Sequence, residues 1–304
     1  MKLKSKLYLP VQWLFLIIII GGFSFSKDKI VFEKIDGFSN EVNKKLENFF
    51  QATENYKGRK IAVFDGDGTV LGQVPNYLAD ECLYDFSNKN PQRKKELIEL
   101  MKTQSNVSME YVQNRVRFLS GDSLNYWRRL GTEHFKKYYS DKIFQPMKKL
   151  ISLLRKNNFE VWIVSASPEA MYQKFLSEAL DIPVTNVIGV RSVIRNGIIT
   201  DEIIQPVPQD HGKKEAIESF VQDRPLFAAG NSRGDKEMIE YASMMRMIVN
   251  PDEHVAPDQK ESIAQYARGN NWLIVNINDT TDVNFPSVTS KVYGIKQNKS
   301  NKIK

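Results

Sequence analysis

The sequence predicts an α/β fold with a Rossmann-like, three-layer core, a parallel sheet covered by helices on both faces, and a helical cap inserted into that core. The first observation is that short apolar runs alternate with amphipathic helical segments, which is typical of parallel sheets buried on both faces. The second is that one long segment, 76–142, leaves this alternation and has the polar and aromatic pattern of helices. We therefore expect a core of residues 27–75 and 143–290 and a cap of residues 76–142.

The individual elements follow from local patterns. Apolar residues at helical spacing from Phe38 to Phe50 predict an amphipathic helix over 39–52. Ser167 and Pro168 are typical of a helix start, with Ser167 as the N-cap and Pro168 at the first helical position. Asn196-Gly197 predicts the turn of a hairpin over 186–204. The expected strands are 60–64, 161–164, 226–229, 247–249 and 272–277, and the other core helices are a helix opened by Pro146, 213–221 and 236–241.

The charge of the chain is concentrated at its ends. The 304 residues carry a formal net charge of +7, with three lysines at positions 2, 4 and 6 and five among residues 291–304. The body between them is close to neutral and has no basic stripe interleaved with aromatic residues, so we expect no nucleic-acid partner. Residues 291–304 are interpreted as a basic flexible tail.

Residues 1–26 have the pattern of a targeting segment. A lysine-rich start is followed by an apolar stretch and by small residues that suit a cleavage site after Ser26. This pattern predicts a signal peptide and an exported domain, periplasmic or secreted. The alternative is a membrane anchor over residues 7–23, which are near the lower length limit for spanning and would hold the domain outside the cytoplasm. Cys82 is the only cysteine, so no internal disulfide can form.

Polar residues capable of chemistry follow three predicted strands and open one predicted helix. Strand 60–64 ends in Asp65-Gly66-Asp67-Gly68-Thr69, and strand 161–164 ends in Ser165-Ala166-Ser167. His211-Gly212-Lys213-Lys214 opens a helix, and Gly230 to Asp235, "GNSRGD", follows strand 226–229. Loops at the carboxyl ends of parallel strands meet at one edge of the sheet, where ligands bind. Two aspartates one residue apart repel each other, so a metal ion, a reaction or a tight turn must favour them.

This ordered set of motifs over residues 60–250 resembles the haloacid dehalogenase superfamily, and the helical insertion resembles its phosphoserine phosphatase and phosphorylcholine phosphatase branch. The resemblance implies that Asp65 attacks phosphorus and forms an aspartyl-phosphate. It implies that Asp67 protonates the leaving group and then activates water. Ser165 would donate to a phosphoryl oxygen, and Lys213 would neutralise its charge, with Lys214 as the alternative lysine.

The resemblance also implies a Mg²⁺ cofactor. Its ligands would be the Asp65 carboxylate, the Asp67 carbonyl, Asn231 and Asp235. Relatives usually have an aspartate where this sequence has Asn231, so one negative charge is missing and metal affinity is expected to fall. Asp235 could ligate directly or through water, or orient Lys213.

The expected substrate is a small phosphomonoester such as phosphocholine or phosphoserine, and the cap is expected to select it. Aromatic rings and carboxylates of the cap could form a cage for a quaternary ammonium, or they could be the core of the cap itself. Arginines at 115, 117, 128 and 129 could instead bind a substrate carboxylate. The predicted substrate-binding residues are Thr69, Glu81, Tyr84, Trp127, Ser165 and Ala166.

The sequence thus predicts a Mg²⁺-dependent phosphomonoesterase that acts through an aspartyl-phosphate. Two alternatives stay open at this point. The chain could be a catalytically weak or inactive protein that binds a phosphate ligand; Asn231, at a position where relatives usually have an aspartate, would be consistent with this. It could also be a phosphotransferase that passes the phosphoryl group from the same aspartyl-phosphate to an alcohol.

Overall fold

The computed structural model describes residues 30–255, 257 and 259–280. The predicted signal peptide or anchor (1–26, with its apolar part 7–23) and the predicted tail (291–304) lie outside these residues. No helix in the described part of the chain is long and apolar enough to cross a membrane.

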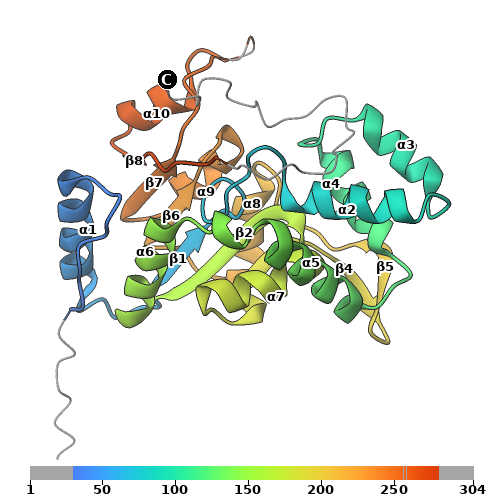
Figure 1. Ribbon diagram of the computed structural model, residues 1–304. Helices are drawn as coiled ribbons and strands as arrows, with labels where there is room; N and C mark the ends of the chain where they lie inside the picture. The colour runs from blue at the N-terminus through green and yellow to red at the C-terminus, as the bar shows by residue number, and fades with distance from the viewer. Residues whose placement is uncertain (1–29, 256, 258, 281–304) are drawn as a thin grey trace, which may run out of the picture.

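A six-stranded parallel sheet forms the centre of the described residues, with strand order β3-β2-β1-β6-β7-β8 (Figure 1). The two central strands are completely buried, and their residues alternate between the two faces, as a sheet covered on both sides requires. The predicted α/β class with a Rossmann-like core is confirmed. The strands are β1 (Ile61–Phe64), β2 (Glu160–Pro168), β3 (Val187–Val190), β6 (Phe227–Gly230), β7 (Met245–Val249) and β8 (Leu273–Val275).

Helices cover both faces of this sheet. On one face Phe64 and Phe227 pack with Phe49 of α1, and the ring centroids of Phe49 and Phe227 are 6.0 Å apart. On the other face Ile61 and Val63 pack against apolar residues of the helical segment 212–221. The first face is covered by α1 (Asn40–Thr53), α6 (Gln145–Lys156) and α7 (Glu169–Leu180). The second is covered by α8 (Gly212–Ala216), the π-helical turn η3 (Ile217–Val221), α9 (Lys236–Tyr241) and α10 (Ile263–Gly269).

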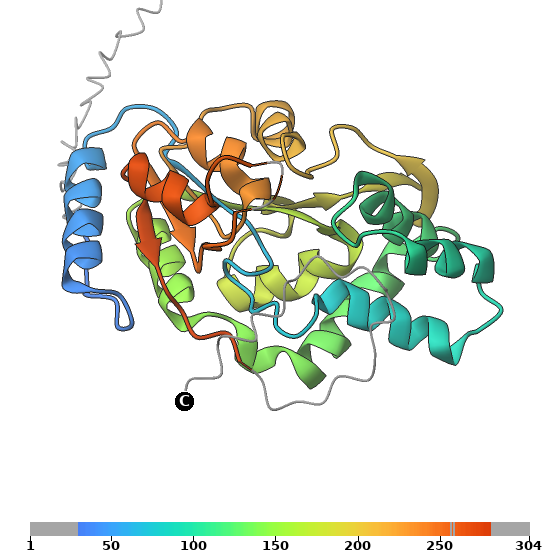
Figure 2. The same cartoon turned by 90° about the horizontal axis from the view of Figure 1, so that it is seen from above.

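Four helices occupy the segment predicted as the cap. They are α2 (Leu78–Lys89), α3 (Lys95–Thr103), α4 (Met109–Leu119) and α5 (Leu124–Tyr138), followed by the 3-10 turn η1 (Ser140–Lys142). Ser108 and Ser123 cap the starts of α4 and α5 with their side chains. The cap joins the core where Phe135 of α5 stacks on Phe175 of α7, with ring centroids 4.6 Å apart. Figures 1 and 2 both show the cap at the end of the molecule opposite α1.

The predicted hairpin over 186–204 is wrong in its first part. Residues 187–190 form β3 of the main sheet, parallel to β2, and only β4 (Ser192–Arg195) and β5 (Ile198–Ile203) form the hairpin. Its turn is at Asn196-Gly197 as predicted, and both residues have positive φ angles. The hairpin lies beside the cap, because Gly121 N donates to Ile199 O at 2.9 Å and Leu124 N donates to Gly197 O at 2.9 Å.

Two further details differ from the sequence-based expectation. The helix after β2 begins at Glu169, Pro168 takes the N-cap position, and no side chain caps this helix. Ser167 is therefore not an N-cap; it is the penultimate residue of β2, and its hydroxyl donates to Asp67. Helix α10 and strand β3 were not predicted, while the last strand, expected over 272–277, is found as Leu273–Val275.

Candidate active site

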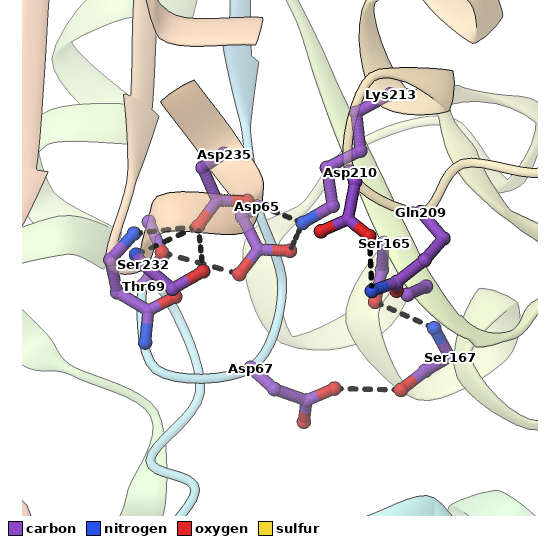
Figure 3. A network of polar contacts seen from close by, with 12 residues as sticks. Asp65, Asp67, Thr69, Ser165, Ser167, Gln209, Asp210, Lys213, Ser232 and Asp235 are labelled. Atoms are coloured by element: carbon purple, nitrogen blue, oxygen red, sulfur yellow. Dashed lines mark hydrogen bonds and ion pairs between the residues drawn. The ribbon is translucent and has the colours of Figure 1, made fainter. Parts of the chain in front are cut away.

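A cavity of about 330 Å³ opens at the carboxyl ends of β1, β2 and β6. This is the edge of the sheet where the predicted motifs meet, since parallel strands that end together bring their following loops together. Six of the predicted site residues line the cavity: Asp65, Asp67, Ser165, Ala166, Lys213 and Asn231. Figure 3 shows Asp65, Lys213 and Asp235 on one side and Asp67 with Ser167 on the other.

The loop after β1 curls tightly and places both aspartates in the cavity. Gly68 N donates to Leu71 O at 2.6 Å, and Leu71 N donates to Gly66 O at 3.1 Å. Gly68 has a φ angle of +80°, and a Cβ atom there would lie 2.1 Å from the Asn231 amide nitrogen. Only glycine fits this position, because the left-handed backbone and the adjacent side chain both exclude a larger residue.

Lys213 lies between two buried carboxylates. Its Nζ donates to Asp65 Oδ1 at 2.6 Å and also to Asp235 Oδ1. Burial disfavours the lysine charge, but the Asp235 and Asp65 carboxylates outweigh it and raise the pKa of Lys213 above its usual value. Lys214 has a different partner, Glu218 at 3.5 Å, so Lys213 is the lysine at the cavity.

The two carboxylates beside Lys213 differ in their other contacts. Asp235 Oδ2 accepts from Asn231 N, Ser232 N and Ser232 Oγ at 2.9 to 3.0 Å. Although burial opposes its charge, Lys213 and these donors lower the pKa of Asp235. Asp65 has fewer donors, and burial together with the nearby Asp235 charge raises the pKa of Asp65 above its usual value. Of the two, Asp65, whose charged form has less stabilisation than that of Asp235, is the aspartate that lines the cavity.

Asp67 is held by two hydroxyl groups. Ser167 Oγ donates to Asp67 Oδ2 at 2.7 Å, and Tyr172 OH donates to Asp67 Oδ1 at 2.9 Å. Burial raises the pKa of Asp67 to about 6, although these two hydrogen bonds favour the charged form. Tyr172 OH also accepts from Ala79 N of the cap at 3.2 Å, so this hydroxyl joins the cap to Asp67.

Ser165 and Ala166 form the wall of the cavity at the end of β2. Ser165 Oγ accepts from Ser167 N at 3.1 Å, and Ala166 O accepts from Arg115 Nη2 at 2.9 Å. Arg115 reaches the cavity from α4 and also pairs with Asp80 Oδ1 at 3.1 Å. Its Nε is buried and has no hydrogen-bond partner. This arginine is therefore the cap cation that contacts the wall of the cavity.

The oxygen-bearing residues at the cavity are of the kinds that bind Mg²⁺. Within the described ranges no group of three or more His, Cys, Asp or Glu side chains is arranged to hold a metal. Mg²⁺ does not require such a group, since it usually binds one or two carboxylates and keeps several waters. Asp65 and Asn231, which carry a carboxylate and an amide oxygen, both line the cavity together with Asp67. The raised pKa of buried Asp65 is further consistent with a carboxylate that a cation would stabilise.

Three predicted ligand contacts have a different geometry from the one expected. Asp235 is completely buried and does not line the cavity; both its oxygens are used by Lys213 and by the loop 231–232, so it orients the lysine. Thr69 is also completely buried, and its Oγ1 donates to Asp65 Oδ2 at 3.4 Å. Glu81 lies inside the cap, where Asn76 Nδ2 donates to its carboxylate.

Two of the aromatic residues considered for a cage, Trp127 and Tyr84, belong to the core of the cap, which is the second of the two alternatives that the sequence leaves open. Trp127 is completely buried between Phe86 and Phe118, and its Nε1 donates to Asp122 Oδ2 at 2.9 Å. Tyr84 is 1% exposed and accepts a hydrogen bond from Tyr111 OH at 3.2 Å. Both rings form the interior of the cap instead of lining the cavity. Helical spacing alone could not separate these two outcomes.

Other residues at the cavity were not predicted. Of the four cap arginines considered, only Arg115 lines it; Arg117, Arg128 and Arg129 contact other side chains. Tyr172 does not line the cavity but donates to Asp67, and it was not predicted because it belongs to the helix after β2. Tyr77, one of the cap aromatic residues considered for a cage, lines the cavity. Residues that were not considered complete the lining, among them Gln73, Asn106, Gln209, Arg233 and His254.

Comparison with known families identifies this arrangement. The sequence model of the haloacid dehalogenase-like hydrolases matches residues 62–240, more than half of the chain. The chain belongs to the haloacid dehalogenase-like hydrolase family. The matched range begins within β1 and contains the four sequence motifs predicted at the site, residues 65–69, 165–167, 211–214 and 230–235. The hydrolase is therefore an enzyme by family, with its candidate active site at the carboxyl edge of the sheet.

Solved structures support the fold of this hydrolase. A conserved protein of unknown function from Anaerococcus prevotii DSM 20548 is similar over 83% of this chain and 98% of its own, at 13% identity and a TM-score of 0.63. A protein of unknown function from Bordetella pertussis Tohama I is similar over 72% and 99%, at 15% identity and a TM-score of 0.55. A comparison with curated proteins found no match.

Proposed function

We propose that this hydrolase is a Mg²⁺-dependent phosphomonoesterase that acts on a small, hydrophilic organic phosphate through an aspartyl-phosphate at Asp65. The observation that carries the proposal is the contact of Lys213 with both Asp65 and Asp235, beside Asp67 and Ser165. Three segments far apart in the sequence supply a nucleophile and an acid and base (65–67), a hydrogen-bond donor (Ser165) and a cation (Lys213) at one cavity, and Asp235 from a fourth segment holds that cation.

In the first proposed step, an Asp65 carboxylate oxygen attacks phosphorus while the bond from phosphorus to the ester oxygen breaks. Lys213 and the Ser165 hydroxyl would stabilise the charge on the phosphoryl oxygens. Asp67 would give its proton to the leaving alkoxide. Its pKa of about 6 keeps part of this carboxyl protonated near neutral pH, which suits an acid that must later act as a base.

In the second proposed step, Asp67 takes a proton from water, and the water oxygen attacks phosphorus. The acyl phosphate bond breaks, phosphate leaves, and the Asp65 carboxylate is restored. Ser167 and Tyr172 would hold Asp67 in one orientation through both steps. Bound Mg²⁺, held by Asp65, the Asp67 carbonyl and Asn231, would supply positive charge that offsets the charge of the phosphate.

The proposed substrate is closer to phosphoserine than to phosphocholine in its chemistry. Trp127 and Tyr84, two of the residues considered for a cage around a quaternary ammonium, lie inside the cap and do not line the cavity. The cap side of the cavity is lined by one cation, Arg115, by Asn106 and Tyr77, and by Val107 and Val112. A volume of about 330 Å³ suits a small molecule.

Export of the hydrolase is a further part of the proposal. It is supported by the lysines, the apolar stretch and the small residues of positions 1–26. Sequencing the N-terminus of the protein recovered outside the cytoplasm is expected to give a start near Lys27. An intact N-terminus in the membrane fraction would instead identify 7–23 as an anchor.

The test of the catalytic proposal is hydrolysis of p-nitrophenyl phosphate with Mg²⁺ and with a chelator. Asp65→Asn should lower kcat by roughly 10³-fold or more, as expected for loss of a nucleophile. Asp201→Asn, at an exposed position of β5, is the matched control, and its kcat should stay close to that of the wild type. Turnover that survives chelation and Asp65→Asn would refute the proposal.

Asn231 favours a second candidate, a protein that binds a phosphate ligand and turns it over weakly or not at all. Fewer charged ligands reduce the affinity for Mg²⁺. Under this alternative, calorimetry would detect phosphate binding while hydrolysis stays absent with every divalent cation tested.

Products formed in glycerol-containing buffer separate hydrolysis from phosphoryl transfer, since a transferase would make glycerol phosphate.

A further inference from the structure

The segment that follows β8 contacts the connections between core and cap. Asp279 lies beyond the range matched by the family model, residues 62–240. Its Oδ2 accepts from Gln73 N at 2.8 Å and from Val74 N at 3.1 Å, and its Oδ1 accepts from Lys142 Nζ at 2.7 Å. One carboxylate thus binds three donors that are far from it in sequence.

The three donors belong to the two linkers of the cap. Residues 72–77 lead from the loop after β1 to α2, and residues 139–144 return from α5 to α6. The linkers also contact each other, since Gly72 N donates to Lys142 O at 2.8 Å. The Asp279 carboxylate therefore joins both linkers at the place where the cap leaves and re-enters the core.

This contact is buried and closely fitted. The side chains of Lys142 and Asp279 are 3% and 7% exposed. A Cβ atom on Gly72 would lie 2.4 Å from Asp279 Oδ1 and 2.7 Å from Lys142 Cε, so only glycine leaves room for the pair. Separating the ion pair would leave a buried charge without a partner, which is strongly unfavourable. The pair therefore holds the two linkers in fixed positions.

The other end of the segment is attached to the wall of the cavity. Asn250 Nδ2 donates to Ile277 O at 2.7 Å, and Ile277 N donates to Asn250 Oδ1 at 2.7 Å. Asn250 itself lines the cavity beside Asp252 and His254. The segment 275–279 therefore runs from the cavity wall to the cap linkers, with hydrogen bonds at both ends.

We propose that Asp279 is a positioning residue, which fixes the two cap linkers and so keeps the cap over the cavity in the arrangement that binds substrate. This inference rests on the proposed function. Asp279 touches neither the cavity nor the reacting groups, so its loss should act through the cap. If only a fraction of molecules has the cap in place, the apparent affinity for substrate falls by that fraction.

The experiment compares Asp279→Ala and Asp279→Asn with Asn278→Ala, a matched control at the exposed neighbouring position. For p-nitrophenyl phosphate with Mg²⁺, Asp279→Ala should raise KM about fivefold to tenfold and leave kcat within about twofold. Asp279→Asn keeps the shape of the side chain but not its charge, so its KM should lie between the values for the wild type and for Asp279→Ala. Asn278→Ala should behave like the wild type.

A second measurement does not depend on activity. Hydrogen exchange of peptides covering residues 72–77 should accelerate in Asp279→Ala, because Gln73 N and Val74 N lose their acceptor. Lys142→Ala should accelerate the same peptides, and the double variant should add little to either single one. Asn278→Ala should leave the exchange unchanged.

Two results would overturn the inference. One is unchanged exchange of residues 72–77 in Asp279→Ala and Asp279→Asn, measured in folded protein. The other is accelerated exchange together with a loss in kcat and no change in KM, since the cap would then not limit binding. If Asp279→Ala does not fold, Asp279→Asn supplies both measurements. Absence of turnover in the wild type would refute the proposed function alone, because the exchange result stands by itself.

Discussion

Asp67 is expected to make the folded protein less stable as the pH rises, and Asp67→Asn should remove this effect. Burial raises the pKa of Asp67 from 3.8 to about 6 in the folded protein. Between pH about 4 and pH about 6 the folded state therefore holds more protons at this site than the unfolded state. Stability falls with rising pH wherever the folded state binds more protons.

The magnitude follows from the size of the shift. One pKa unit corresponds to about 1.4 kcal/mol, so a shift of about two units costs about 3 kcal/mol above pH 6. The cost disappears only well below pH 3.8, the ordinary pKa, where the carboxyl is protonated in both states. Asparagine keeps the shape of the side chain and cannot ionise, so the free energy of unfolding of Asp67→Asn should not fall for this reason as the pH rises.

The assay is urea unfolding of the wild type and Asp67→Asn from pH 4 to pH 8, in the presence of a chelator. The difference in free energy of unfolding, variant minus wild type, should rise by up to about 3 kcal/mol across this range. For the exposed control Asp201→Asn the same difference should stay within about 0.5 kcal/mol. A difference for Asp67→Asn that stays constant within about 1 kcal/mol, or falls with pH, would refute the reasoning.

Three further outcomes are expected. Tyr172→Phe removes a donor to Asp67 and should lower kcat/KM about tenfold more for an alkyl phosphate than for p-nitrophenyl phosphate, because an alkoxide needs a proton to leave; equal losses would contradict this role. Asn231→Asp adds a charged oxygen at the cavity and should lower the Mg²⁺ concentration for half-maximal activity about tenfold; an unchanged requirement would remove Asn231 from the metal site. Trp127→Ala empties a buried position against Phe86 and should lower the free energy of unfolding by about 3–5 kcal/mol, with equal effects on phosphocholine and p-nitrophenyl phosphate; a selective loss with phosphocholine would favour the cage instead.

The sheet was predictable because buried parallel strands have a simple sequence pattern. Val63 and Phe64 belong to an apolar run that ends in polar residues, and the strands around them show the same pattern. Strand β3 was missed because residues 187–190 come directly before a true hairpin, and its strong turn signal at Asn196-Gly197 was extended too far. Local turn chemistry fixes the turn but not how many residues pair across it.

The candidate site was predictable where its residues follow strand ends. Asp65, Asp67 and Ser165 were placed at one cavity because their strands are parallel and end together. The cap side was not predictable in the same way. Trp127 and Arg115 both lie on cap helices, and the spacing along a helix does not tell which face meets the core and which meets the cavity.

Contacts that join distant segments gave no signal in the sequence. Asp279 reaches Lys142 and the backbone of Gln73 across the fold, and a single aspartate near the end of a chain resembles any surface residue. Serine before a helix usually caps it, so the sequence predicts Ser167 as an N-cap. Its hydroxyl instead binds Asp67, which only the three-dimensional position of the loop after β1 could reveal.

The most direct test of the account is to find the phosphorylated residue. Asp67→Asn should still be phosphorylated by p-nitrophenyl phosphate, whose leaving group needs little protonation, but should lose its base for the hydrolysis step. The covalent species should therefore accumulate. After quenching and borohydride reduction, peptide mass spectrometry is predicted to find homoserine at position 65, and only when substrate was present. Turnover that leaves Asp65 unmodified while another residue is converted would contradict the account.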